Sequence, residues 1–194
     1  MKPKVGIALT GSFCTFHRVL DVLKDLKDYD LIPIMSEAAY SCDTRFGSKE
    51  TFRNALEEIC GNPVLHSLQQ VEPLGPKKLL DALVILPCTG NTLGKLANGI
   101  ADSPVTFACK AHLRNGRPVI LGISTNDGLS SSGENIGKLL GRKHFYFLPF
   151  GQDDPQGKPY SLVAHMELLP QTLNLALKGE QYQPILREYE SSHC

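Results

Sequence analysis

The sequence lacks an excess of charge of either sign. Its 194 residues contain 20 Lys plus Arg and 20 Asp plus Glu, which gives a formal net charge of zero. A neutral chain gives no reason to expect nucleic-acid binding, because that binding depends on neutralising backbone phosphates. It equally disfavours a polybasic membrane anchor. We therefore expect no nucleic acid and no membrane surface among the partners of this chain.

Long apolar runs and paired cysteines are also missing. No segment approaches the roughly 20 apolar residues that a membrane-spanning helix needs, and no signal-peptide pattern follows the N-terminus. We therefore expect a cytoplasmic protein. None of its cysteines forms a CxxC pair, so we expect reduced thiols at Cys14, Cys42, Cys60, Cys88, Cys109 and Cys194. Cys14 and His17 could share a helix face, but without further ligands we favour ordinary packing and predict no metal.

The sequence does contain a regular alternation of apolar runs and amphipathic segments. Strands are predicted at 4–9, 31–35, 82–86 (ended by Pro87), 118–123 and 145–148. Helices are predicted at 13–26, 49–60, 92–100, 104–115, 132–140 and 162–178, with a polar loop at 36–47 and a lid-like loop at 151–159. This order predicts an α/β three-layer sandwich with a mostly parallel, Rossmann-like (flavodoxin-like) sheet. The length suits one domain over 1–194, with its core at about 4–178 and a polar tail at 179–194.

Small polar residues follow the predicted strands. In a parallel sheet, ligands bind beyond the carboxyl ends of the strands, so these corners are candidate binding residues. The first corner is Thr10-Gly11-Ser12, where a glycine and hydroxyls at a helix start suit either an anion or simple helix capping. Ser36 follows the second strand, and Asn126 lies in the corner after the fourth. The triplet is not a GxGxxG fingerprint, so a standard dinucleotide site is not predicted.

The corner after the central strand reads LPCTGNTLGKLANGIAD, from 86 to 102. Gly90 permits close approach of the backbone, Asn91 offers a donor and an acceptor, and Thr92 is expected to cap the helix. Lys95 follows one turn later and could neutralise an anion. Cys88 has two readings: a thiol with a lowered pKa beside a helix start, or an inert small side chain.

These corners resemble a known family. The segments ALTGS, LPCTGNT and KLANGIADSPVT resemble the flavoprotein fold of flavin-dependent cysteine decarboxylases, whose signature is P-A-S/T-A-N-T followed by K-x-A-N-G-I-A-D. The resemblance covers roughly 4–178 and implies FMN as a cofactor. Together, the corners and the resemblance predict one cofactor-binding set: Thr10, Gly11, Ser12, Ser36, Cys88, Thr89, Gly90, Asn91, Thr92 and Asn126.

Within that family, the chain closely resembles the B subunits of dipicolinate synthases. That resemblance implies oxidation of a dihydro- or tetrahydro-dipicolinate to pyridine-2,6-dicarboxylate during sporulation, in the mother-cell cytoplasm. It also implies a partner, the A subunit of dipicolinate synthase, which binds NADP, and a homo-oligomeric assembly. A small dicarboxylate substrate needs cations, and the candidates are Lys95, Lys110, Arg114 and Arg117.

The chain departs from the decarboxylases at two places. They carry a histidine shortly before the central strand, where this chain has VEPL at 71–74 and its nearest histidine is His66. Their lid carries a cysteine, and the segment GQDDPQGKPYSLVAH has none. Cysteine decarboxylation is therefore disfavoured. Two alternatives stay open: a non-catalytic subunit that supports its partner, and a flavin prenyltransferase, whose P-C-S segment resembles Pro87-Cys88-Thr89.

Overall fold

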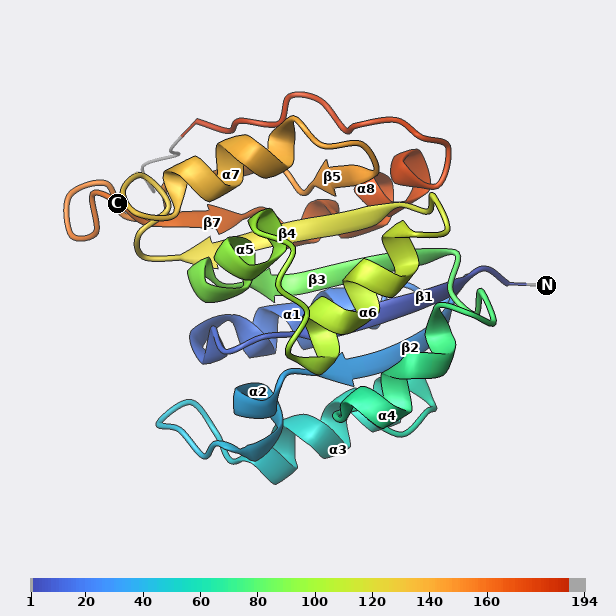
Figure 1. The fold of residues 1–194 in the computed structure, drawn as a ribbon. Helices are drawn as coiled ribbons and strands as arrows, with labels where there is room; N and C mark the ends of the chain where they lie inside the picture. Colours follow the sequence, from blue (N-terminus) through green and yellow to red (C-terminus); the bar gives the residue numbers. More distant parts are fainter. Residues whose placement is uncertain (1, 189–194) are drawn as a thin grey trace.

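Seven strands form one sheet in the order β2-β1-β3-β4-β7-β6, with β5 paired to β4. The computed structural model describes residues 2–188 (Figure 1). The strands are β1 (Lys4–Leu9), β2 (Asp30–Met35), β3 (Ala82–Cys88), β4 (Val119–Thr125), β5 (Phe145–Phe147), β6 (Phe150–Gly151) and β7 (Leu162–Ala164). Strands β1 to β5 pair in parallel, whereas β7 pairs antiparallel with β4 and β6. The predicted mostly parallel sheet is confirmed.

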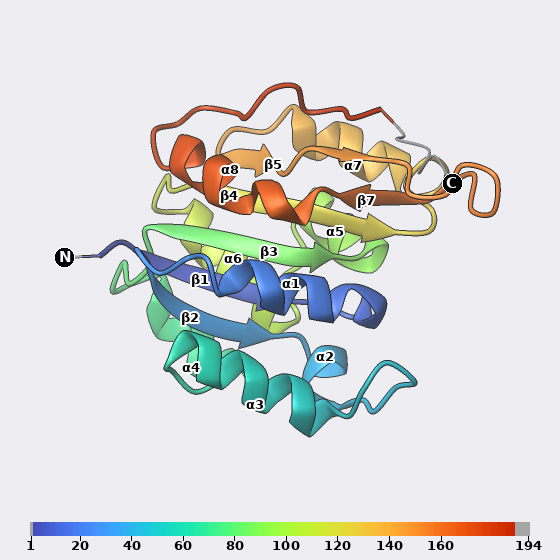
Figure 2. The same cartoon turned by 180° about the vertical axis from the view of Figure 1, so that it is seen from behind.

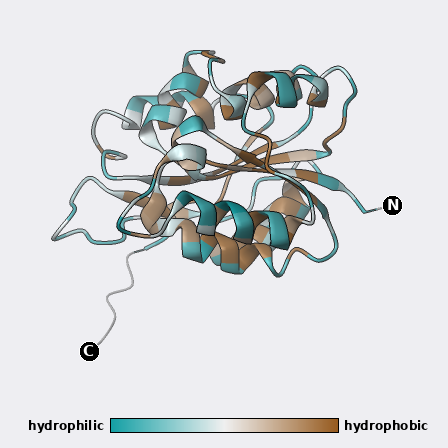
Figure 3. Ribbon diagram, turned by 90° about the horizontal axis from the view of Figure 1, so that it is seen from below, coloured by the Kyte–Doolittle hydropathy of each residue, from teal (hydrophilic) through white to brown (hydrophobic). Residues whose placement is uncertain are grey.

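Helices cover both faces of this sheet. They are α1 (Phe16–Leu23), α2 (Glu37–Ser41), α3 (Lys49–Cys60), α4 (Leu68–Val71), α5 (Gly90–Ala97), α6 (Pro104–Leu113), α7 (Gly133–Leu140) and α8 (Leu169–Ala176), with 3-10 turns η1 (Phe13–Thr15), η2 (Glu72–Leu74) and η3 (Met166–Leu168). Helices α5, α6 and α7 lie on one face (Figure 1), and α1 and α8 on the other (Figure 2). Viewed from below, the sheet lies between two helical layers (Figure 3), so the predicted three-layer fold is confirmed.

Local sequence explains why the central elements form. All seven residues of β3 are buried, as expected for a continuous apolar run covered on both faces. Helix α3 begins where the Ser48 side chain accepts a hydrogen bond from the Thr51 N–H, and it ends at Gly61, whose φ of 65° is left-handed. Helix α6 begins at Ser103 and Pro104, the predicted cap and first residue.

Several predicted boundaries were wrong, and three of them change the type or the end of an element. Pro87 does not end β3, which continues to Cys88 with a shift in its pairing to β4 between Ile85 and Cys88. The loop at 36–47 contains α2. The helix predicted at 162–178 begins only at Leu169, because Val163 pairs with Ser124 on β4 and makes 162–164 a strand. The pairing of β7 with β4 thus outweighs the helical pattern of residues 162–168.

The polar tail packs against the sheet over its described part. The Gln181 side chain accepts from the Phe147 N–H and donates to the Phe147 carbonyl, both at 2.8 Å. Further along, the Arg187 N–H donates to the Phe150 carbonyl at 3.0 Å. Residues 179–188 therefore extend the edge near β5 and β6, while 189–194, including Cys194, lie outside the described residues.

Candidate functional site

The corners after β1, β3 and β4 are joined by direct hydrogen bonds. The buried Thr10 hydroxyl donates to the Pro87 carbonyl at 2.7 Å and accepts from the Thr89 N–H at 3.1 Å. The hydroxyls of Ser12 and Ser124 lie 2.7 Å apart. These bonds bring the three predicted corners together at the carboxyl edge of the sheet.

Helix α5 begins at this junction. Thr89 is its N-cap, with its hydroxyl accepting from the Thr92 N–H at 3.4 Å and lying 3.1 Å from the Thr92 hydroxyl. The prediction that Thr92 caps the helix was wrong, because the extended backbone ends at Thr89 and the helix already begins at Gly90. Within residues 2–188, the N–H groups of Gly90 and Asn91 have no acceptor. Such free N–H groups and the helix dipole favour an anionic group at this point.

Two clefts open on either side of the junction, and Gly11 and Thr89 line both. The first, the strap cleft, measures about 410 Å³ and is lined partly by the segment 152–161, which we call the strap. The second, the elbow cleft, measures about 490 Å³. Its lining residues are Thr10, Gly11, Ser36, Glu37, Ala38, Thr89, Asn91, Thr92, Lys95, Asp102 and Ser103. The strap cleft is lined by Gly11, Ser12, Cys14, Thr15, Arg18, Thr89, Ser124, Thr125, Asn126, Asp153, Lys158, Ser161 and Val163.

Polar groups of the elbow cleft are largely satisfied within the fold. The Ser36 hydroxyl caps α2 by accepting from the Ala39 N–H at 3.3 Å. Lys95 donates to both carboxylate oxygens of Asp102, at 2.8 and 3.0 Å, and this hydrogen bonding lowers the pKa of Asp102. The cation that was predicted to meet an anion is therefore already paired with Asp102.

Gly90 lies against protein atoms and lines neither cleft. A Cβ atom at this position would lie 2.6 to 2.8 Å from side-chain oxygens of Ser132, Asp127 and Thr125. Asp127 accepts hydrogen bonds from Ser131, at 2.6 Å, and from Thr125, and these bonds lower the pKa of its carboxyl. The close approach predicted for Gly90 is present, but it serves packing against this acidic turn.

Cys88 is likewise placed inside the protein. Its side chain is fully buried and lines neither cleft, although it was predicted among the cofactor-binding residues. Burial raises the pKa of its thiol, with a smaller contribution from Cys109. A lowered pKa would require the Cys88 thiol to be accessible beside the N-terminus of α5. The structure therefore fits the other reading, in which Cys88 is an inert small side chain.

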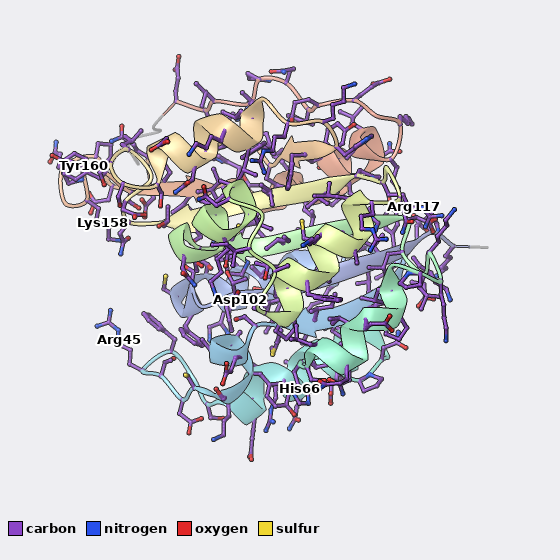
Figure 4. All side chains as sticks on the ribbon, in the orientation of Figure 1. Arg45, His66, Asp102, Arg117, Lys158 and Tyr160 are labelled. Carbon is purple, nitrogen blue, oxygen red and sulfur yellow. The ribbon has the colours of Figure 1, made fainter. Side chains whose placement is uncertain are left out.

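The other predicted cations lie away from both clefts. Arg117 donates to the carbonyls of Lys78, at 3.0 Å, and Leu80, before the amino end of β4, and Figure 4 shows it at the opposite end of the molecule from Lys158. Lys110 and Arg114 line a separate apolar groove on α6. The cations that do line a cleft are Arg18 and Lys158, together with the paired Lys95.

Sequence reasoning missed the residues that give the strap cleft its charge. Arg18 lies on α1 beyond the strand corner, while Lys158 and Ser161 belong to the strap, where only a loop or lid was expected. Asn126 also lines this cleft, and its role in binding a cofactor stays a prediction. The available signal was the cluster of Asp and Lys in GQDDPQGKP. The search for polar residues directly after each predicted strand does not reach this segment.

The described residues contain neither a metal-binding cluster nor a helix that could span a membrane. Between 2 and 188, no group of three or more His, Cys, Asp or Glu side chains could hold a metal ion. His17 packs edge-on against Phe52, and Cys14 lies apart at the strap cleft. No described helix has the length and apolar character needed to cross a bilayer.

Comparison with known proteins identifies relatives of this arrangement. The flavoprotein family model matches residues 1–129. The chain is 46% identical over 187 residues to the B subunit of dipicolinate synthase from Bacillus subtilis, covering 95% of this chain and 94% of the relative. The crystal structure of the dipicolinate synthase B subunit from Bacillus halodurans matches with a TM-score of 0.88 and 47% identity over 97% of each chain. An FMN-dependent cysteine decarboxylase, SpaF, shares the fold with a TM-score of 0.67 at 20% identity, over 90% of this chain and 97% of that one. The chain belongs to the flavoprotein family.

Proposed function

We propose that this chain is the B subunit of a dipicolinate synthase and that the junction between its two clefts binds FMN. The observation that carries the first part is the 46% identity to the B subunit of a dipicolinate synthase over 95% of the chain. The family match, and relatives described as FMN-dependent or FMN-binding, support the second part.

The residues at the junction fit a flavin nucleotide. Hydroxyls of Thr89 and Thr92 and the free N–H group of Asn91, three residues that line the elbow cleft, are neutral donors suited to a phosphate. Gly11 lines both clefts and leaves space there, since a Cβ atom would make only ordinary contacts with Phe13 and Ala38, at 3.8 and 3.9 Å. The elbow cleft is lined by two carboxylates, Glu37 and Asp102, and one cation, Lys95. Asp102 is paired with Lys95, and Glu37 is exposed to solvent, where its charge is screened.

In this proposal, the reaction forms pyridine-2,6-dicarboxylate from a dihydro- or tetrahydro-dipicolinate during sporulation, in the mother-cell cytoplasm. FMN, when bound, supplies a two-electron acceptor that can take a hydride from such a ring. The chain's own residues bind the nucleotide, orient the substrate beside it and limit access of water. The nicotinamide-binding A subunit, with NADP, is the partner that completes the enzyme, and a homo-oligomer of this chain is expected.

A second candidate is a non-catalytic B subunit that stabilises the A subunit. It is favoured by the composition of the two cleft linings, which contain no histidine among the residues described, and by a strap without cysteine. The side chains used for acid–base and thiol chemistry in cysteine decarboxylases are therefore not available here.

One set of assays separates the two candidates. Product formation is measured for this chain, for its A-type partner and for both together, each with and without FMN and NADP. The proposal predicts micromolar or tighter FMN binding and activity of the pair that depends on the junction residues. Full activity of the pair when FMN binding by this chain has been abolished would favour the supporting role.

A further inference from the structure

The strap cleft contains a polar atom that the fold leaves without a partner. Ser161 is 1% exposed, and its Oγ makes no hydrogen bond with any atom of residues 2–188. Buried hydroxyls are nearly always bonded, and an unmet one costs free energy. Ser161 also lines the strap cleft, so a ligand bound in that cleft lies beside this residue.

The same cleft has an excess of positive charge. Arg18 and Lys158 line it together with a single carboxylate, Asp153, so the lining carries one net positive charge. Lys158 lies 3.6 Å from Asp153, and Arg18 makes no ion pair within the described chain. Anionic ligands are favoured where such cations meet a buried hydroxyl donor.

The strap is held in place by its own hydrogen bonds. The Lys158 N–H donates to the Asp154 backbone carbonyl at 2.8 Å, and the Ser161 N–H donates to the Lys158 backbone carbonyl at 3.0 Å. The Leu129 N–H, on the loop after β4, donates to the Tyr160 carbonyl at 3.0 Å. Figure 4 shows Lys158 and Tyr160 together where the strap projects beyond the carboxyl edge of the sheet. The backbone that carries Lys158 and Ser161 is therefore held in place without any ligand.

We propose that Ser161, Lys158 and Arg18 bind a carboxylate of the small dicarboxylate substrate. The Ser161 Oγ donates a hydrogen bond to one carboxylate oxygen, and the two cations balance the charge. This inference rests on the proposed function for the identity of the substrate class, and it does not depend on FMN. Asn91 and Thr92, at the start of α5, line the elbow cleft and not the strap cleft, so the two anionic groups are assigned to different clefts.

Calorimetric titration of the full chain with pyridine-2,6-dicarboxylate tests the proposal, at low ionic strength, with and without saturating FMN. The variants are Ser161→Ala, Lys158→Gln and Arg18→Gln. Thr172→Val is the matched control for the hydroxyl, because Thr172 is fully buried and its Oγ is also unpartnered, but it lies on α8 and lines neither cleft. Lys110→Gln is the control for removal of one charge.

The proposal predicts that Ser161→Ala weakens dicarboxylate binding about tenfold or more, as expected for a hydrogen bond to a charged group. Lys158→Gln and Arg18→Gln weaken it by about three- to tenfold each, and they reduce its salt dependence. Both controls bind the dicarboxylate as the unchanged chain does. FMN affinity, measured in parallel, stays the same in Ser161→Ala.

Unchanged dicarboxylate binding by Ser161→Ala would overturn the proposal, as would absence of binding to the full chain in the presence of FMN. Competition by inorganic phosphate at equal concentration would show a general anion site and also count against it. Dicarboxylate binding that follows the predicted variants in a chain that takes up no FMN would preserve this inference and defeat the flavin proposal.

Discussion

The two clefts share Gly11 and Thr89 but differ in how their polar groups are used. In the elbow cleft, Ser36 caps α2, Thr89 caps α5 and Lys95 is paired with Asp102. In the strap cleft, Ser161 has no partner and Arg18 no counter-ion among the described residues. The named side chains of the elbow cleft therefore already stabilise the fold, whereas the strap cleft also contains a hydroxyl and a cation that have no partner within residues 2–188.

The largest expected effect comes from breaking the junction itself, with Thr10→Val. This change leaves the Pro87 carbonyl and the Thr89 N–H without their buried partner. We expect a loss of about 2 to 3 kcal/mol in the free energy of unfolding, measured by urea denaturation. Thr172→Val removes a hydroxyl that has no partner, so it should cost nothing or stabilise. Equal losses in the two variants would contradict the account.

Substitutions at Gly90 and Gly11 distinguish an effect on packing from an effect on FMN binding. Gly90→Ala places a Cβ within 2.8 Å of three side-chain oxygens and should lower stability by about 1 to 3 kcal/mol. Gly11→Ala meets no atom closer than 3.8 Å, so stability should be kept, while the added methyl group takes up space where the two clefts share a lining and weakens FMN binding. Thermal unfolding and FMN titration of both variants test this. A stable Gly90→Ala chain, or Gly11→Ala with unchanged FMN affinity, would be contrary results.

A smaller effect is expected at low pH. The folded pKa of Asp127 is lowered, first by the Ser131 hydrogen bond, so the protonated form is disfavoured in the folded state. Its stabilisation is present above the ordinary pKa of about 4 and is lost as pH falls through the lower folded value. Asp127→Asn should therefore be less stable than the unchanged chain at pH 6, with the gap closing toward pH 3. A gap that widens on acidification would contradict this.

The smallest effect is expected at the paired lysine of the elbow cleft. Lys95 and Asp102 form an ion pair of which the Asp102 side chain is more than half exposed, and such pairs contribute little at ordinary salt. Lys95→Gln should leave thermal stability at 0.5 M salt unchanged and FMN affinity close to that of the unchanged chain. A large loss of FMN binding would show that Lys95 leaves Asp102 to contact the phosphate.

Much of the framework could be predicted from the sequence. The buried run of β3 and the Ser48 and Ser103 caps follow from local patterns, and the strand-corner rule brings Gly11, Ser12, Thr89 and Asn126 to one edge. A lid-like loop was predicted at 151–159, but its placement was not, because β7 at its end pairs with β4 through Val163 and Ser124, which are far apart in the sequence. That pairing places Lys158 and Ser161 in the cleft. The burial of Cys88 could not be predicted either, because it depends on tertiary packing in the region where Cys109 is also buried.

FMN titration of the full chain, followed by quenching of flavin fluorescence, tests the central claim most directly. The account predicts saturable binding with a dissociation constant in the micromolar range or below, corresponding to about 8 kcal/mol or more of binding free energy. It also predicts weaker binding by Gly11→Ala at unchanged stability. A chain that remains folded and shows no saturation at FMN concentrations of about 1 mM would contradict the claim that the junction binds a flavin nucleotide.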